Sequence, residues 1–216
     1  MIQINAQESY ALDQVLFTFA LPAEAADVFT PYRHLICGIG KLQAAYHLSK
    51  AIHANRPALI VNLGSAGSAH FPKGSLVCCN AFIQRDMDVR GLGYALYETP
   101  LSRQEPLLKY GLSMPGLPTA VCGTGDNFEM AHSGTQYQVV DMEAYALAYV
   151  ARQEGIPFLS LKYITDGADG DAPEDWTVQV HHTAHVFARI LDLPGYTEQR
   201  TSDLNSDKIN NVQADN

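Results

Sequence analysis

Two separated acidic segments contain the residues of this chain best suited to chemistry. The first, 139–146, reads Val-Val-Asp-Met-Glu-Ala-Tyr-Ala and contains Glu143; the second, 163–169, reads Tyr-Ile-Thr-Asp-Gly-Ala-Asp and contains Asp166. Each acid follows an apolar run and precedes helix-forming or turn-forming residues, so each is predicted at the end of a strand. Ligands of parallel α/β sheets bind at the carboxyl ends of strands. We therefore expect Asp166 and Glu143 to share a cleft.

The elements that would position these acids alternate between strand and helix patterns. Short apolar runs punctuated by Gly or Pro predict strands at 16–20, 33–37, 58–63, 76–83, 119–122 and 157–163. Apolar residues at helical spacing predict helices over 42–54, 143–154 and 175–191. This alternation predicts a single α/β domain over 1–193, with a mixed, mostly parallel central sheet flanked by helices. The polar segment 194–216 is predicted to be a loosely attached tail.

The composition limits the class of partner. The chain has 216 residues, 47% of them hydrophobic, and 23 acidic against 14 basic side chains give a net charge of -9. This charge opposes binding to nucleic acid and to anionic membranes. No apolar run approaches the roughly 18 residues that span a bilayer, and residues 1–14 lack a signal-peptide pattern. We expect a cytoplasmic protein with a small-molecule ligand.

The cysteines and histidines carry little functional signal. The four cysteines lie in apolar contexts without a CxxC pair and are predicted to be reduced core residues. Cys78 and Cys79 are adjacent on a predicted strand, so their side chains should point to opposite faces. His181 and His185 have the i, i+4 spacing of metal ligands, but the pattern fixes no third ligand, so these and His182 are expected to be solvated or capping, with no metal bound.

The glycine-rich segment 38–41, Gly-Ile-Gly-Lys, lacks the rest of a nucleotide-binding motif. A phosphate-binding loop would need a glycine at Leu35 and a hydroxyl residue at Leu42, and a dinucleotide fingerprint would need a glycine at Gln43. The segment is therefore predicted to be a tight turn from strand to helix, in which the glycines allow positive φ angles.

Three candidate residues also have purely structural readings. Asp166 could cap a turn, and Glu24 could simply favour the positive end of a helix dipole. Ser65 lies in Gly-Ser-Ala-Gly, which lacks the Gly-x-Ser-x-Gly elbow of serine hydrolases, so it is a weak nucleophile candidate. The flanking glycines instead suit close approach of a ligand to the backbone.

The order of several motifs resembles the nucleoside phosphorylase and nucleosidase superfamily. Besides the two acidic segments, these are Ala-Leu-Pro-Ala-Glu at 20–24, Gly-Ile-Gly-Lys at 38–41, Asn-Leu-Gly-Ser-Ala-Gly at 62–67, Asp-Met-Asp-Val at 86–89 and Thr-Gly-Asp-Asn-Phe at 124–128. Within the superfamily the chain is most similar to the 5'-methylthioadenosine/S-adenosylhomocysteine nucleosidases. The resemblance implies a nucleoside phosphorylase-like fold and cleavage of a purine N-glycosidic bond with no cofactor and no metal.

The resemblance also implies a division of catalytic roles. Asp166, kept protonated by a low-dielectric pocket and next to the Thr165 hydroxyl, would donate a proton or hydrogen bond to purine N7 as general acid. Glu143, as an anion, would accept hydrogen bonds from the ribose hydroxyls while Met142 packs on the sugar. Glu24 would orient and deprotonate water as general base.

Other matched positions would complete the pocket. Phe128 would stack on the purine, and Ser65 would lie beside the ribose or the attacking water. Trp176 would cap the site from a lid, and Leu42 would supply an apolar wall. Two differences from the nearest nucleosidases are Lys162 in place of arginine and Leu-Pro-Ala at 21–23 in place of an acidic segment.

The segment after residue 88 is implied to act across a dimer. Val89, Leu92 and Pro100 match apolar positions that reach the partner's pocket for the 5'-substituent. A homodimer with composite sites is therefore expected.

Several activities remain open at this point. Phosphorolysis would need cationic ligands for phosphate, whereas the approach to the glycine-rich segment, 58–62, has no basic residue, which favours hydrolysis. A nucleoside-binding protein that turns over weakly or not at all is an alternative from another class. The apolar positions favour a methylthio substituent, whereas futalosine would need a partner for its carboxylate, and only Arg85 and Arg90 lie close in sequence.

Overall fold

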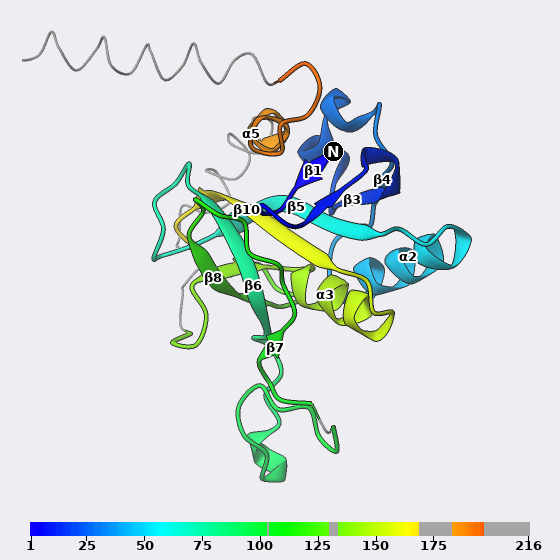
Figure 1. Ribbon diagram of the computed structural model, residues 1–216. Coiled ribbons are helices and arrows are strands. Elements are labelled where there is room, and N and C mark those ends of the chain that lie inside the picture. Colours follow the sequence, from blue (N-terminus) through cyan, green and yellow to red (C-terminus); the bar gives the residue numbers. More distant parts are fainter. Residues whose placement is uncertain (103, 130–133, 169–182, 197–216) are drawn as a thin grey trace, which may run out of the picture.

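A computed structural model describes residues 1–102, 104–129, 134–168 and 183–196. Its central sheet has eight strands in the order β10-β6-β8-β9-β5-β3-β4, with β7 beside β6 (Figure 1). The strands are β3 (Val15–Phe19), β4 (His34–Ile36), β5 (Leu59–Gly67), β6 (Leu76–Gln84), β7 (Leu108–Lys109), β8 (Thr119–Thr124), β9 (Val139–Asp141) and β10 (Phe158–Asp166). A separate hairpin joins β1 (Ile2–Gln3) and β2 (Ser9–Tyr10).

The sheet is mixed and mostly parallel, as predicted. The pairs β3–β4, β3–β5, β5–β10, β6–β8 and β8–β9 are parallel. The pairs β6–β10, β5–β9 and β6–β7 are antiparallel. Because β5 pairs with both β9 and β10, the sheet curves around and brings the carboxyl ends of these three strands together.

Helices cover both faces of the sheet. Helices α2 (Lys41–Ala54) and α3 (Ala144–Gln153) pack on one face, and α5 (Thr183–Ile190) packs on the other with the N-terminal hairpin (Figure 1). Helix α1 (Pro22–Ala25) is a single turn after β3. Short 3₁₀ turns occupy η1 (Leu12–Gln14), η2 (Asp27–Phe29) and η3 (Arg90–Leu92).

The core divides between the two faces because side chains alternate along a strand. In β5, Leu59 and Val61 join the cluster under α5, whereas Ile60 joins the cluster under α2 and α3. Cys78 and Cys79 divide in the same way, as predicted. All four cysteines are buried and free, which confirms the prediction of reduced core residues.

The predicted elements lie close to the observed ones, and the differences fall near the site. Strands β5 and β10 run further than predicted, through Gly67 and Asp166. The part of the last predicted helix before Thr183 lies outside the described residues. At the start of the predicted tail, Tyr196 packs against the cluster under α5; residues 197–216 are not described, so the tail remains a prediction.

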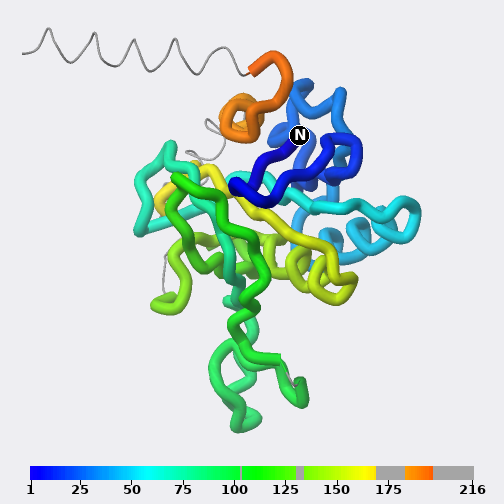
Figure 2. Tube along the Cα trace, in the orientation of Figure 1, coloured from blue at the N-terminus to red at the C-terminus, as the bar shows by residue number. Residues whose placement is uncertain are grey.

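Residues 86–102 project from the body of the molecule as an arm (Figure 2). The arm exposes Leu92 and Leu101, by 73% and 91% respectively. In the described ranges, no helix has the length and apolar character needed to cross a bilayer.

Candidate active site

A cavity of about 590 Å³ opens where β5, β9 and β10 end. In the sheet register Gly67 of β5 pairs with Val140 of β9 and with Asp166 of β10, which explains why acids from different elements meet here. Asp166 and Glu143 line the same cavity, as expected. The lining residues are Ala20, Leu21, Glu24, Ile39, Ser65, Ala66, Gly67, Arg85, Asn127, Phe128, Glu129, Val140, Asp141, Met142, Glu143 and Asp166.

Glu24 ties the first turn of α1 to the end of β5. Its Oε2 accepts hydrogen bonds from the backbone N–H groups of Ala20 and Leu21, at 3.0 and 3.1 Å. Its Oε1 accepts from both the backbone N–H and the hydroxyl of Ser65, each at 2.8 Å. The carboxylate is buried, and four donors suit its anionic form. Glu24 therefore both caps the first turn of α1 and faces the cavity.

Glu143 lies at the start of α3 and is held by the glycine turn. Its Oε1 accepts a 2.7 Å hydrogen bond from the backbone N–H of Gly40, whose φ of 88° confirms the positive angle predicted for this turn. Burial, followed by the charge of Asp141, raises the pKa of Glu143 to about 8. The raised pKa favours the protonated carboxyl group, whereas the expected ribose contact uses the anion.

A buried ion pair between Lys162 and Asp141 acts electrostatically on Glu143. Lys162 Nζ lies 2.8 Å from Asp141 Oδ2, and both side chains are 2% exposed. Burial disfavours the Asp141 anion, but Lys162 and the hydroxyl of Thr124 outweigh it and hold the pKa of Asp141 below its usual value. Burial also lowers the pKa of Lys162, but its acidic neighbours raise it on balance. Both groups are therefore charged.

Asp166 is buried at the end of β10. Its Oδ2 accepts a 2.9 Å hydrogen bond from the Thr165 hydroxyl, and its Oδ1 accepts one from the backbone N–H of Ala168, also at 2.9 Å. The Ala168 contact is the turn-capping geometry of the structural reading. A Cβ atom at Gly67 would lie 2.5 Å from Asp166 Oδ1, so glycine is needed there for the acid to reach the cavity.

The remaining wall combines an aromatic ring with a second ion pair. Phe128 lines the cavity with 45% of its surface exposed, and Met142 lies on the wall beside Glu143. Arg85, at the end of β6, forms a 3.1 Å ion pair with Glu129. Sequence reasoning missed Asp141, Asn127 and Glu129 as cavity residues. Asp141 adjoins Met142 in the sequence, and Asn127 and Glu129 adjoin Phe128, which was the signal that could have identified them.

The structure does not bring every proposed residue to this cavity. Leu42 is 79% exposed and lines a separate cavity of about 320 Å³ beside α2 and α3. Val89, Leu92 and Pro100 lie on the arm, outside the lining set, so their contact with a partner's pocket remains a prediction. Trp176 lies outside the described residues.

No group of three potential metal ligands occurs within the described ranges. His185 instead faces Tyr196, whose hydroxyl lies 3.3 Å from its Nδ1. His181 and His182 fall outside the part of the chain that is described.

Part of the chain matches a known superfamily, the phosphorylase superfamily. The model of that superfamily matches residues 119–191, which include β8, β9, α3 and β10. The matched residues include Phe128, Glu143 and Asp166.

Similar proteins include nucleosidases. The 5'-methylthioadenosine/S-adenosylhomocysteine nucleosidase of Staphylococcus saprophyticus is 27% identical over 177 residues, covering 72% of this chain and 77% of the relative. Its counterpart in Shewanella halifaxensis is 26% identical, covering 71% and 78%. A mutant of the Helicobacter pylori enzyme with 5'-methylthioadenosine in its active site has the same fold: the TM-score is 0.74 at 19% identity, covering 82% of this chain and 96% of that one. Futalosine hydrolase of Helicobacter pylori gives 0.72 at 18% identity, covering 80% and 93%.

Proposed function

We propose that this protein is a nucleosidase, an N-glycosyl hydrolase that cleaves 5'-methylthioadenosine or S-adenosylhomocysteine to release the purine. The observation that carries the proposal is the convergence of Asp166, Glu143 and Glu24 from three different elements on one cavity. The curated relatives with this activity support it.

At the base end, Asp166 is the general acid. Cleavage leaves electron density on the departing purine, and a proton or hydrogen bond at N7 stabilises it. The Thr165 hydroxyl lies 2.9 Å from Asp166 Oδ2 and 3.3 Å from the carbonyl oxygen of Ala66. It can donate to the Asp166 anion, or donate to Ala66 and accept from a protonated Asp166. Thr165 therefore supports Asp166 before and after proton transfer.

At the sugar, Glu143 holds the ribose hydroxyls and Met142 packs on the ring. An oxocarbenium-like sugar is stabilised by nearby negative charge that is already oriented. Because burial raises the pKa of Glu143 and favours its protonated form, substrate binding must favour loss of the proton. The ribose hydroxyls donate hydrogen bonds to the Glu143 anion, so bound substrate favours the deprotonated form.

Glu24 is the general base for the attacking water. Its four contacts fill the acceptor positions of the carboxylate, so water can bind only by replacing one of them. Three of the donors are backbone N–H groups and are fixed. The Ser65 hydroxyl can rotate away, which gives Ser65 a role in admitting or orienting the water.

The charges around the cavity favour hydrolysis over phosphorolysis. Phosphate needs free cationic donors. Among the described lining residues Arg85 is the sole cationic side chain, and Glu129 and Asn127 already bind it. The same argument favours a methylthio substituent over futalosine, whose carboxylate would need such a cation.

A homodimer in the cytoplasm completes the proposal. The exposed Leu92 and Leu101 of the arm, together with Leu42 on α2, are apolar surface that a second copy could bury. Val89, Leu92 and Pro100 would then complete the partner's 5'-substituent pocket.

Base release by the purified protein tests this activity. Wild-type protein incubated with 5'-methylthioadenosine in phosphate-free buffer should release adenine, which is measured by chromatography. Release that strictly requires added phosphate and yields ribose 1-phosphate would identify a phosphorylase instead. Binding without release would identify a nucleoside-binding protein.

A further inference from the structure

Arg85 holds the loop that carries Phe128. Its guanidinium contacts both chain neighbours of that ring: Nη1 donates to Asn127 Oδ1 at 2.9 Å and lies 3.1 Å from Glu129 Oε2, and Nη2 donates to the backbone oxygen of Asn127. A planar guanidinium that makes several directed contacts fixes orientation as well as distance. The loop on both sides of Phe128 is thus bound to the end of β6.

The contacts of Arg85 with Asn127 and Glu129, here called the clamp, are buried and closely fitted. The side chains of Arg85 and Glu129 are only 5% and 7% exposed, so removal of either partner leaves the other as a buried charge that has lost its ion pair. A Cβ atom at Gly125 would lie 2.8 Å from Arg85 Cζ, so the loop lies directly against the guanidinium. The buried Tyr137 donates its hydroxyl to Glu129, with both carboxylate oxygens at 3.2 Å.

The same cluster supports the general acid. Tyr137 packs in a small core with Ile83, Val140 and Ala168. The backbone N–H of Ala168 donates to Asp166 Oδ1. The loop that carries Phe128 and the acid Asp166 are therefore anchored to one group of side chains.

We propose that Arg85 is a positioning residue that acts on base binding through Phe128. The inference rests on the proposed function, in which Phe128 stacks on the purine. The described contacts of the Arg85 guanidinium are to the loop, so its loss should affect the placement of the ring more than the chemistry at Asp166 and Glu24.

A double-mutant cycle tests this coupling by steady-state kinetics of adenine release from 5'-methylthioadenosine. Arg85→Met and Phe128→Ala should each raise KM by about 10-fold, the scale of a lost base-stacking contact, with a smaller change in kcat. The double variant should be no worse than Phe128→Ala alone. Arg85→Lys should restore part of the loss, because a point charge can pair with Glu129 but cannot reproduce the fork.

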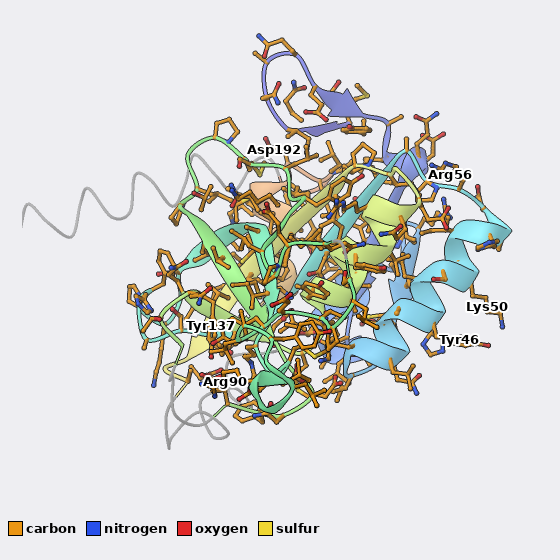
Figure 3. The ribbon with its side chains drawn as sticks, turned by 90° about the horizontal axis from the view of Figure 1, so that it is seen from below. Tyr46, Lys50, Arg56, Arg90, Tyr137 and Asp192 are labelled. Atoms are coloured by element: carbon orange, nitrogen blue, oxygen red, sulfur yellow. The ribbon has the colours of Figure 1, made fainter. Side chains whose placement is uncertain are left out.

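Arg56→Met is the matched control, since Arg56 forms an exposed pair with Glu154 and lies well apart from Tyr137 (Figure 3). It should change neither KM nor kcat.

If the increases in KM caused by Arg85→Met and Phe128→Ala multiply in the double variant, Arg85 acts independently of the ring and the inference is overturned. If Arg85→Met does not fold, Glu129→Gln, which keeps the size of the side chain, replaces it in the cycle under the same criterion. If the wild type releases no base, the proposed function fails, and the same cycle measured on adenine binding by calorimetry tests the clamp separately.

Discussion

Asp166 and Glu143 are both buried carboxyl groups of one cavity, and their different partners suit different tasks. Asp166 is held by a hydroxyl that can adapt to either protonation state. Asp166→Asn keeps the size of the side chain but removes the transferable proton. We expect kcat to fall by about 10²- to 10⁴-fold with little change in melting temperature, measured by adenine release and thermal denaturation. An unchanged rate would remove Asp166 from the mechanism.

Glu143 gives the protein a pH-dependent stability with a defined sign. Its pKa is raised to about 8 in the folded chain, above the ordinary 4.5 of an unfolded glutamate. Its contribution to the free energy of unfolding is therefore full below about pH 4.5 and is lost as pH rises through about 8.

Glu143→Gln should weaken the pH dependence of the free energy of unfolding between about pH 4.5 and about pH 8. In urea denaturation between pH 5 and 9, the wild type should lose stability relative to the variant as pH rises. Glu154→Gln, a substitution of a partly exposed glutamate paired with Arg56, is the control and should follow the wild type. A wild type that gains stability relative to Glu143→Gln over this range would contradict the assignment.

At the scale of elements, the site depends on how closely β5 and β10 approach. Gly67→Ala places a Cβ atom 2.5 Å from Asp166 Oδ1, so Asp166 must move. We expect a loss of at least about 10-fold in kcat/KM, because small misplacement of a catalytic group is costly. Gly155→Ala, after α3 at a φ of 63° with nothing within 4 Å of the added Cβ atom, should lower stability but leave kcat/KM as in the wild type. Equal kinetics in both variants would show that the approach is unimportant.

The strands and helices that carry the site were predictable because their periodicity is local. Short apolar runs located β5 and β10, and helical spacing located α2 and α3, to within a few residues. The curvature that lets β5 pair with both β9 and β10 is a long-range property and left no local pattern.

For the same reason, the candidate acids were found from their motifs, whereas contacts between distant segments were not. The pairing of Lys162 with Asp141 joins residues from different strands, and that of Arg85 with Glu129 joins the end of β6 to a loop. Neither could be derived from spacing.

At the scale of the whole molecule, the arm and α2 present the apolar surface expected of a dimer contact. Figure 3 shows Tyr46 and Lys50 on the outer side of α2, away from the sheet. Leu92→Asp places a charge on the exposed arm. We expect it to shift the protein toward monomer in sedimentation velocity and to raise KM for 5'-methylthioadenosine, because the 5'-substituent pocket would be incomplete. Asp13→Ala, at an exposed position of η1, should do neither. A wild type that is monomeric yet fully active would refute the composite site.

The central claim is hydrolysis of a purine nucleoside with an apolar 5'-substituent. The most direct measurement is base release from 5'-methylthioadenosine, S-adenosylhomocysteine, 5'-deoxyadenosine, futalosine and inosine, compared in parallel in phosphate-free buffer. We predict turnover without phosphate and the highest kcat/KM for 5'-methylthioadenosine. A clear preference for futalosine or inosine would contradict the proposed specificity, and no release from any of the five would contradict the nucleosidase assignment itself.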